Sequence, residues 1–144
     1  GMIKPNDPHK APVTEEDLPL PKSGPFGKAE IEETNHEFGT KLVGSKDSHT
    51  FSIKNTGEGQ LEIKLGKPTC QCTVGEIRKL GKDGSKEVPK DKDQPVLLAV
   101  GETVEIFVEW KMRSEMEKFR QVVPVFTTDP AFKSSCVTVS WAVQ

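Results

Sequence analysis

The sequence predicts an all-β, immunoglobulin-like β-sandwich of about seven to nine antiparallel strands. Apolar and polar residues alternate along several short segments, and turn residues recur at roughly ten-residue spacing. No segment of useful length has the period of a helix. A sandwich needs strands that are apolar on one face, whereas a parallel α/β fold needs helices between its strands. The pattern therefore favours the sandwich.

The N-terminal segment, residues 1–27, differs in composition from the rest of the chain. Prolines fix φ and lack a backbone donor, and six of them interrupt this segment: Pro5, Pro8, Pro12, Pro19, Pro21 and Pro25. We predict a flexible or extended leader over residues 1–27 and one sandwich domain over residues 28–144. Alternatively, Leu18-Pro19-Leu20-Pro21 is a docking segment that lies in a polyproline-like form on the domain or on a partner.

Four strands are predicted in the first half of the domain: residues 29–38, 48–54, 61–65 and 69–77. The first ends at Gly39. Alternate side chains of a strand share a face, so the second strand places Phe51 in the core, and Phe38 is a core candidate on the first. Asn55-Thr56-Gly57 is a turn that returns the chain antiparallel, with glycine free to adopt positive φ.

Four further strands are predicted in the second half: residues 96–100, 103–110, 119–128 and 136–143. The strand over residues 103–110 has four apolar side chains on one face, which indicates a strand that lines the core. Residues 79–93 form a polar loop in which residues 81–84 can close a hairpin. Residues 111–118 form a helical turn or a loop.

Several motifs together resemble the bacterial family known as domain of unknown function 1573 (DUF1573). They are Phe38-Gly39-Thr40, Phe51-Ser52-Ile53-Lys54-Asn55-Thr56-Gly57, Leu61-Glu62-Ile63, Thr69-Cys70-Gln71-Cys72-Thr73, Gly101-Glu102, the strand that ends at Trp110, and Thr127-Thr128-Asp129-Pro130. The resemblance covers residues 31–143. It implies a sandwich similar to pilus chaperones and major sperm proteins, without enzymatic activity and often exported. The family usually has glycine where this chain has Gln71.

Cys70 and Cys72 are the one pair of residues with site-like spacing. On a strand they share a face, so two thiolates can hold a soft ion such as Cu(I) or supply half of a zinc site. Other interpretations are a strained Cys70–Cys72 disulfide that acts as a redox switch, or a bridge from either residue to Cys136. The simplest interpretation is that all are reduced and pack as small apolar side chains.

Composition and the remaining polar residues argue against several other classes of function. The net charge is −2, with 20 basic and 22 acidic residues, which disfavours a nucleic-acid partner. No apolar run approaches the roughly 20 residues of a membrane span. His36 and His49 fall on predicted strands and are expected at the surface or at a sheet edge. Glu32 and Glu33 should point to opposite faces of a strand, so no catalytic residues are predicted.

Two functional hypotheses follow. The first is a non-catalytic binding or structural module that pairs an edge strand with a segment of a protein partner, within an exported or envelope-associated assembly. The second is a metal- or redox-handling module that uses Cys70 and Cys72. Neither hypothesis requires a tightly bound organic cofactor or catalytic chemistry.

Overall fold

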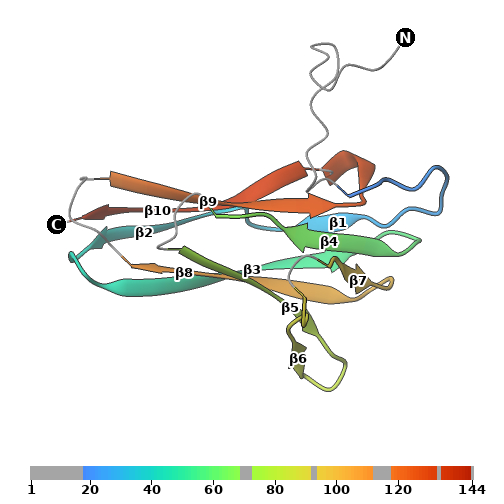
Figure 1. Ribbon diagram of the computed structural model, residues 1–144, viewed down its shortest axis with the longest axis horizontal. Coiled ribbons are helices and arrows are strands. Elements are labelled where there is room, and N and C mark those ends of the chain that lie inside the picture. The colour runs from blue at the N-terminus through green and yellow to red at the C-terminus, as the bar shows by residue number, and fades with distance from the viewer. Residues whose placement is uncertain (1–17, 69–72, 92–93, 112–117, 133, 144) are drawn as a thin grey trace, which may run out of the picture.

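Ten strands form two five-stranded sheets that lie face to face (Figure 1). The computed structural model describes residues 18–68, 73–91, 94–111, 118–132 and 134–143. The elements are β1 (Ala29–Ile31), β2 (Asn35–Lys41), β3 (Lys46–Asn55), β4 (Leu61–Leu65), β5 (Thr73–Leu80), β6 (Lys86–Glu87), β7 (Val96–Leu98), β8 (Thr103–Lys111), β9 (Lys118–Thr127), the 3-10 helix η1 (Pro130–Phe132) and β10 (Ser134–Val143).

The first sheet has the strand order β1-β3-β8-β5-β6 and the second has the order β2-β10-β9-β4-β7. All pairs are antiparallel except β2 and β10, which are parallel. The predicted all-β, immunoglobulin-like sandwich is confirmed. The described strands exceed the predicted number because the predicted strand over residues 29–38 is two strands and because the two-residue β6 lies in the predicted loop.

The predicted strand over residues 29–38 is in fact two strands that lie in different sheets. β1 pairs with β3 in the first sheet, and β2 pairs with β10 in the second. Residues 32–34 cross between the sheets. Thr138 of β10 fixes the end of this crossing, because its N–H donates to the carbonyl of Thr34 at 2.7 Å and its hydroxyl lies 2.6 Å from Asn35 Oδ1.

Gly39 forms a bulge in β2. Glu37 lies opposite Ser140 and Thr40 lies opposite Ala142, so two residues of β2 face one residue of β10. Gly39 has φ of 74°, a backbone conformation that glycine adopts without steric cost. This geometry explains why a glycine follows Phe38 in the middle of a strand.

The core lies between the two sheets and consists of apolar residues that alternate along the long strands. Its fully buried members include Phe51, Ile53, Leu61, Ile63, Leu98, Val104, Ile106, Val108, Trp110, Val123, Val125, Val137 and Val139. Phe38 is half-buried and packs against this cluster. The alternation that predicted the strands is thus the pattern of inward and outward side chains.

The fully buried side chain of Asn55 links several backbone segments at one end of the sandwich. Its Oδ1 accepts hydrogen bonds from the backbone N–H groups of Lys28 at 3.1 Å and Gly57 at 3.0 Å. Its Nδ2 donates to the carbonyls of Gly59 at 2.9 Å and Leu98 at 3.1 Å. Four backbone groups from three parts of the chain therefore depend on one amide.

The turn after Asn55 packs tightly on the segment that precedes β1. The carbonyl of Phe26 accepts hydrogen bonds from Glu58 and Gly59, each at 3.1 Å. A Cβ on Gly57 would lie 2.5 Å from the Phe26 carbonyl oxygen, so only glycine fits there. Leu18, further toward the N-terminus, is also buried.

Glu102 makes a pH-dependent contribution to stability. The Ala99 N–H donates to its carboxylate at 2.6 Å, and this bond, with the Lys79 ammonium 3.3 Å away, lowers the pKa of Glu102 below its ordinary value of 4.5. Because the folded-state pKa is depressed, the contribution is present above the unfolded pKa and is lost as the pH falls through the folded pKa. We expect wild type to be more stable than Glu102→Gln near neutral pH, with the difference in Tm shrinking as the pH falls from the unfolded pKa through the folded one. Calorimetric scans whose Tm difference stays constant over that range would contradict this.

Candidate functional site

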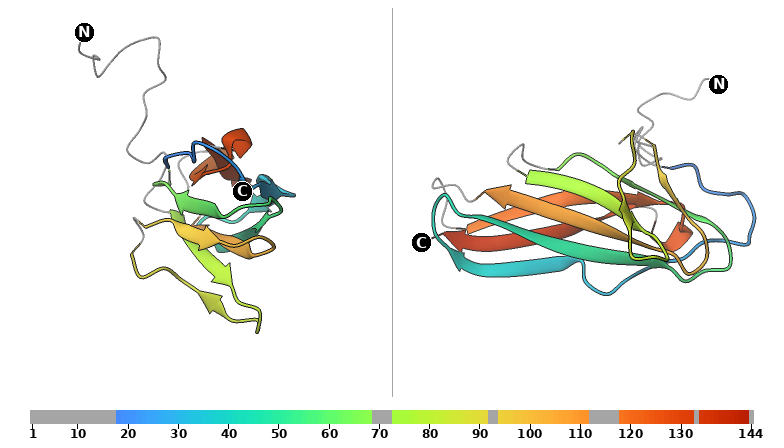
Figure 2. Two further views of the ribbon diagram at one scale, coloured as in Figure 1. Left: turned by 90° about the vertical axis from the view of Figure 1, so that its right-hand side faces the viewer. Right: turned by 90° about the horizontal axis from the view of Figure 1, so that it is seen from below.

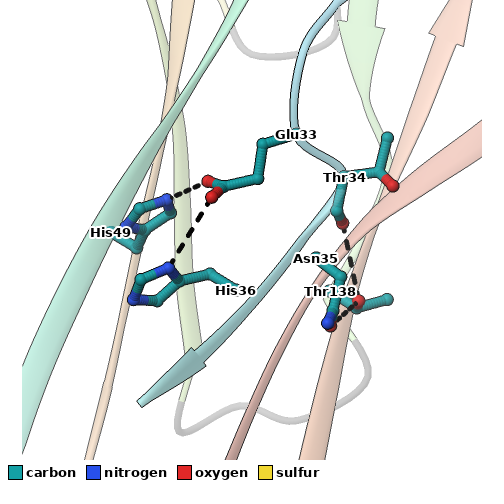
Figure 3. A network of polar contacts seen from close by, with 6 residues as sticks. All are labelled: Glu33, Thr34, Asn35, His36, His49 and Thr138. Atoms are coloured by element: carbon teal, nitrogen blue, oxygen red, sulfur yellow. Dashed lines mark hydrogen bonds and ion pairs between the residues drawn. The ribbon is translucent and has the colours of Figure 1, made fainter.

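Two histidines meet at the side of the sandwich where an edge of each sheet comes close to the other. His36 lies on β2 and His49 lies on β3, and their rings stack with centroids 3.6 Å apart and planes inclined by 7° (Figure 3). The side chains are 31% and 22% exposed, so both remain open to solvent on one side. A stacked imidazole pair at the boundary between two sheets is therefore the most distinctive polar feature of the described chain.

The carboxylate of Glu33 points at both histidines (Figure 3). One of its oxygens contacts His49 Nε2, and the other lies 3.9 Å from His36 Nδ1. One nitrogen or oxygen atom from each residue of this Glu33–His36–His49 cluster lies within 4.8 Å of the other two.

Local sequence explains why the rings face each other. The pattern His-x-Phe occurs twice, as His36-Glu37-Phe38 and His49-Thr50-Phe51. Because strand side chains alternate, each histidine shares the inward face with its phenylalanine. The ring centroids of Phe38 and His36 are 4.5 Å apart, those of Phe51 and His49 are 4.8 Å apart, and both pairs meet edge to face. The phenylalanines thus hold the histidine rings in place.

The expectation for Glu32 and Glu33 was wrong in one respect. Neither residue lies on a strand, since both belong to the crossing between β1 and β2. The rule of opposite faces therefore does not apply, and Glu33 reaches the histidines from the crossing. His36 and His49 do lie on strands beside a sheet edge, but the alternation of single strands gave no sign that the two residues meet. The repeated His-x-Phe pattern was the signal that could have linked them.

The predicted cysteine pair cannot be placed. Cys70 and Cys72 lie outside the described residues, so metal binding and disulfide formation by them stay predictions. Cys136 lies on β10 opposite Pro124, is half-buried, and forms no disulfide with any of the described residues.

β5 has a regular open edge. Residues 73–79 of this strand pair with β8, but on the other side β6 pairs only with Lys79 and Leu80. In the described part of the chain, no strand pairs with that side of residues 74–78. The β5–β6 hairpin extends away from the body of the sandwich (Figure 2), and this leaves the edge accessible from one direction. A cavity of about 220 Å³ lies at the end of this edge, lined by Lys79, Glu87, Pro89, Pro95, Val96 and Leu97.

The other sheet edges offer poorer templates for an added strand. β1 and β7 have three residues each. β2 has the Gly39 bulge, and bulges disrupt strand pairing. β2 and the first half of β3 also face each other across the sandwich, joined by the histidine stack and by an ion pair of 2.9 Å between Lys41 and Asp47. The side of β5 that faces away from β8 is a regular edge with no such partner strand among the described residues.

Comparison with protein families settles the membership of the chain. The family described as "Protein of unknown function (DUF1573)" matches residues 29–140. The chain belongs to the DUF1573 family. This match includes the motifs at Phe38, Asn55 and Asp129 on which the resemblance rested. A search of the curated proteins found no match.

Solved structures share the fold. A protein of unknown function from Porphyromonas gingivalis W83 aligns at 16% identity with a TM-score of 0.59, over 81% of this chain and 46% of that protein. The seventh PapD-like domain of human CEP192 aligns at 16% identity with a TM-score of 0.53, over 88% of this chain and 93% of that domain. A family 123 glycoside hydrolase from Clostridium perfringens aligns at 7% identity with a TM-score of 0.51, over 76% of this chain and 22% of that enzyme.

These similarities establish the fold alone, because all three identities are low. The chain spans about half the length of the Porphyromonas gingivalis protein. The PapD-like likeness agrees with the expected immunoglobulin-like sandwich. In the described residues, no helix combines the length and the apolar character that crossing a bilayer requires.

Proposed function

We propose that this chain is a non-catalytic binding module that holds an extended segment of a protein partner against the open edge of β5. The observation that carries the proposal is the run of residues 74–78, which pairs with β8 on one side and with no described strand on the other. Unpaired backbone N–H and C=O groups along a strand form a ready template for another strand. Main-chain hydrogen bonds then supply affinity, and alternate side chains supply specificity.

The side chains along this edge indicate what kind of segment fits. Val74 is 49% exposed, an apolar side chain left uncovered at the start of the edge. Further along, Arg78 Nε lies 2.5 Å from Glu76, and its guanidinium lies 4.4 Å from the ring centroid of Phe107. The internal ion pair leaves the edge without a strong net charge. A segment with an apolar residue opposite Val74 and polar residues beyond it would complement this pattern.

The family resemblance extends the proposal to the setting of the partner. We propose that the partner belongs to an exported or envelope-associated assembly, since members of the family are often exported. The overall charge of −2 supports a protein partner better than a nucleic acid. The cavity beside Val96 and Leu97 offers space for one side chain of the bound segment.

Site-specific photo-cross-linking in the native host tests the proposal. A photoreactive residue at position 74, 76 or 78 should cross-link to neighbouring positions of one partner segment, in a two-residue register. The matched control is position 100, where Val100 is 55% exposed in the turn between β7 and β8, outside residues 74–78. Equal cross-linking from position 100, or cross-links without a register, would contradict strand pairing.

A charge at the edge should weaken binding of that segment. Lysine on an exposed edge strand disfavours pairing with another strand, so we expect Val74→Lys to lower affinity for the identified segment by at least about tenfold, or roughly 1.4 kcal/mol. The stability of the free protein should change by less than about 0.5 kcal/mol, because Val74 is exposed. The control Val100→Lys should bind as wild type does. Isothermal titration of the synthetic segment measures the difference, and equal affinities for the two variants would refute the role of β5.

A further inference from the structure

We propose that Glu33, His36 and His49 form a binding site for one divalent transition-metal ion, with Zn²⁺ as the representative cation. The proposal is independent of the open edge of β5, since the cluster lies on β2, β3 and the crossing that precedes β2. It also requires neither Cys70 nor Cys72.

The donor atoms match this class of ion. Two imidazole nitrogens and one carboxylate oxygen form the ligand set of open zinc sites and of the two-histidine, one-carboxylate iron sites. Such sites keep further positions for water. The side chains of Glu33, His36 and His49 are between 22% and 46% exposed, so water can complete the coordination shell.

The spacing is close to what one ion needs. Zinc binds nitrogen and carboxylate oxygen at about 2.0–2.2 Å, so two donors on one ion lie at most about 4.4 Å apart. In the cluster, every donor lies within 4.8 Å of the others. To converge on one ion the three side chains must rotate, and the two imidazole rings, now parallel to within 7°, must tilt so that their nitrogen lone pairs meet. The geometry also specifies the ligand atoms, because Nδ1 of His36 and Nε2 of His49 are the nitrogens that face the carboxylate.

Surrounding residues hold the donors in this arrangement. Thr138 bonds to Thr34 and Asn35, the residues between Glu33 and His36, and so fixes the backbone from which both donors project (Figure 3). Phe38 and Phe51 pack edge to face on the two imidazoles. Preorganised ligands lose little conformational freedom on binding, which favours affinity. An ion pair with a structural role needs only one histidine beside the carboxylate, whereas here two histidines face it.

The test is a Zn²⁺ titration of the full chain followed by calorimetry and by histidine ¹H–¹⁵N correlation spectra. We expect one Zn²⁺ per chain at this site, with the ring-nitrogen shifts showing coordination by Nδ1 of His36 and Nε2 of His49. His9, the third histidine of the chain, should not shift. Binding should persist in the triple variant C70S/C72S/C136S, which removes every thiol.

Matched variants separate the cluster from its surroundings. E33Q, H36Q and H49Q should each weaken Zn²⁺ binding by at least about tenfold, whereas E32Q and H9Q should bind as wild type does. Zn²⁺ should raise the Tm of wild type and E32Q but not that of H49Q, since only a ligand bound to the folded state stabilises it. Melting curves in EDTA show whether each variant is folded.

Two results would overturn the proposal. One is unchanged Zn²⁺ affinity in both H36Q and H49Q when these variants melt cooperatively in EDTA. The other is loss of all Zn²⁺ binding in C70S/C72S/C136S while this variant stays folded, which would move the metal to the cysteines. Loss of binding on H49Q with retention on H9Q and E32Q supports the cluster.

Discussion

Replacing Asn55 by alanine is expected to lower the free energy of unfolding by about 4 kcal/mol. The amide is fully buried and makes four hydrogen bonds to backbone groups. Alanine leaves the N–H groups of Lys28 and Gly57 and the carbonyls of Gly59 and Leu98 without that partner. Each buried group left unsatisfied costs about 1–3 kcal/mol, and water reaches some of them at the end of the sandwich.

Asn35→Ala is the matched control for this effect. Asn35 is exposed, and its Oδ1 accepts a hydrogen bond from the Thr138 hydroxyl at 2.6 Å. Its loss should cost about 1 kcal/mol. Urea denaturation of both variants gives the comparison. If Asn55→Ala costs no more than Asn35→Ala, the buried amide does not hold this end of the sandwich together.

Replacing Phe51 by alanine is expected to cost about 3–5 kcal/mol, the usual range for a large aromatic side chain removed from a core. Phe51 is 1% exposed and lies on β3, which pairs with β8 in the middle of the first sheet. The substitution removes apolar contacts and leaves a cavity between the sheets. It also removes the ring that packs against His49 at 4.8 Å, so the His49 resonances should broaden or shift.

Phe26→Ala tests whether burial is the cause. Phe26 is 39% exposed and precedes β1, so its replacement should cost about 1 kcal/mol or less. Guanidinium denaturation of the two variants measures the difference in unfolding free energy. Equal losses would mean that Phe51 does not occupy the core as described.

Much of the fold follows from local sequence. Alternating apolar side chains predicted a strand over residues 103–110, and β8 spans Thr103–Lys111 with Val104, Ile106, Val108 and Trp110 buried. The glycine-rich turn over residues 81–84 does close the β5–β6 hairpin, with Gly84 at φ of 86°. Each of these features depends on a few neighbouring residues, so the sequence of one segment is enough to predict it.

The candidate sites depend on information that no single segment contains. Alternation predicts a strand but not the sheet that the strand joins. The sequence therefore predicts one strand over residues 29–38, although the chain crosses between the sheets at residues 32–34. Only after that crossing does His36 face His49, thirteen positions away in the sequence and in the other sheet. The open edge of β5 likewise depends on which strands lie beside it, and no described strand pairs with that side of residues 74–78. The sequence of β5 alone does not contain this information, because strand order is a property of the whole sheet.

Amide hydrogen exchange with and without the cross-linked partner segment tests the central claim most directly. Strand addition at β5 predicts slower exchange at alternate amides within residues 74–78, since alternate N–H groups of an edge strand point toward the added strand. The amides of β2 (Asn35–Lys41) should exchange as they do in the free protein. Protection that falls on β2 or on the Asn55 turn, with residues 74–78 unchanged, would contradict the account and place the partner elsewhere.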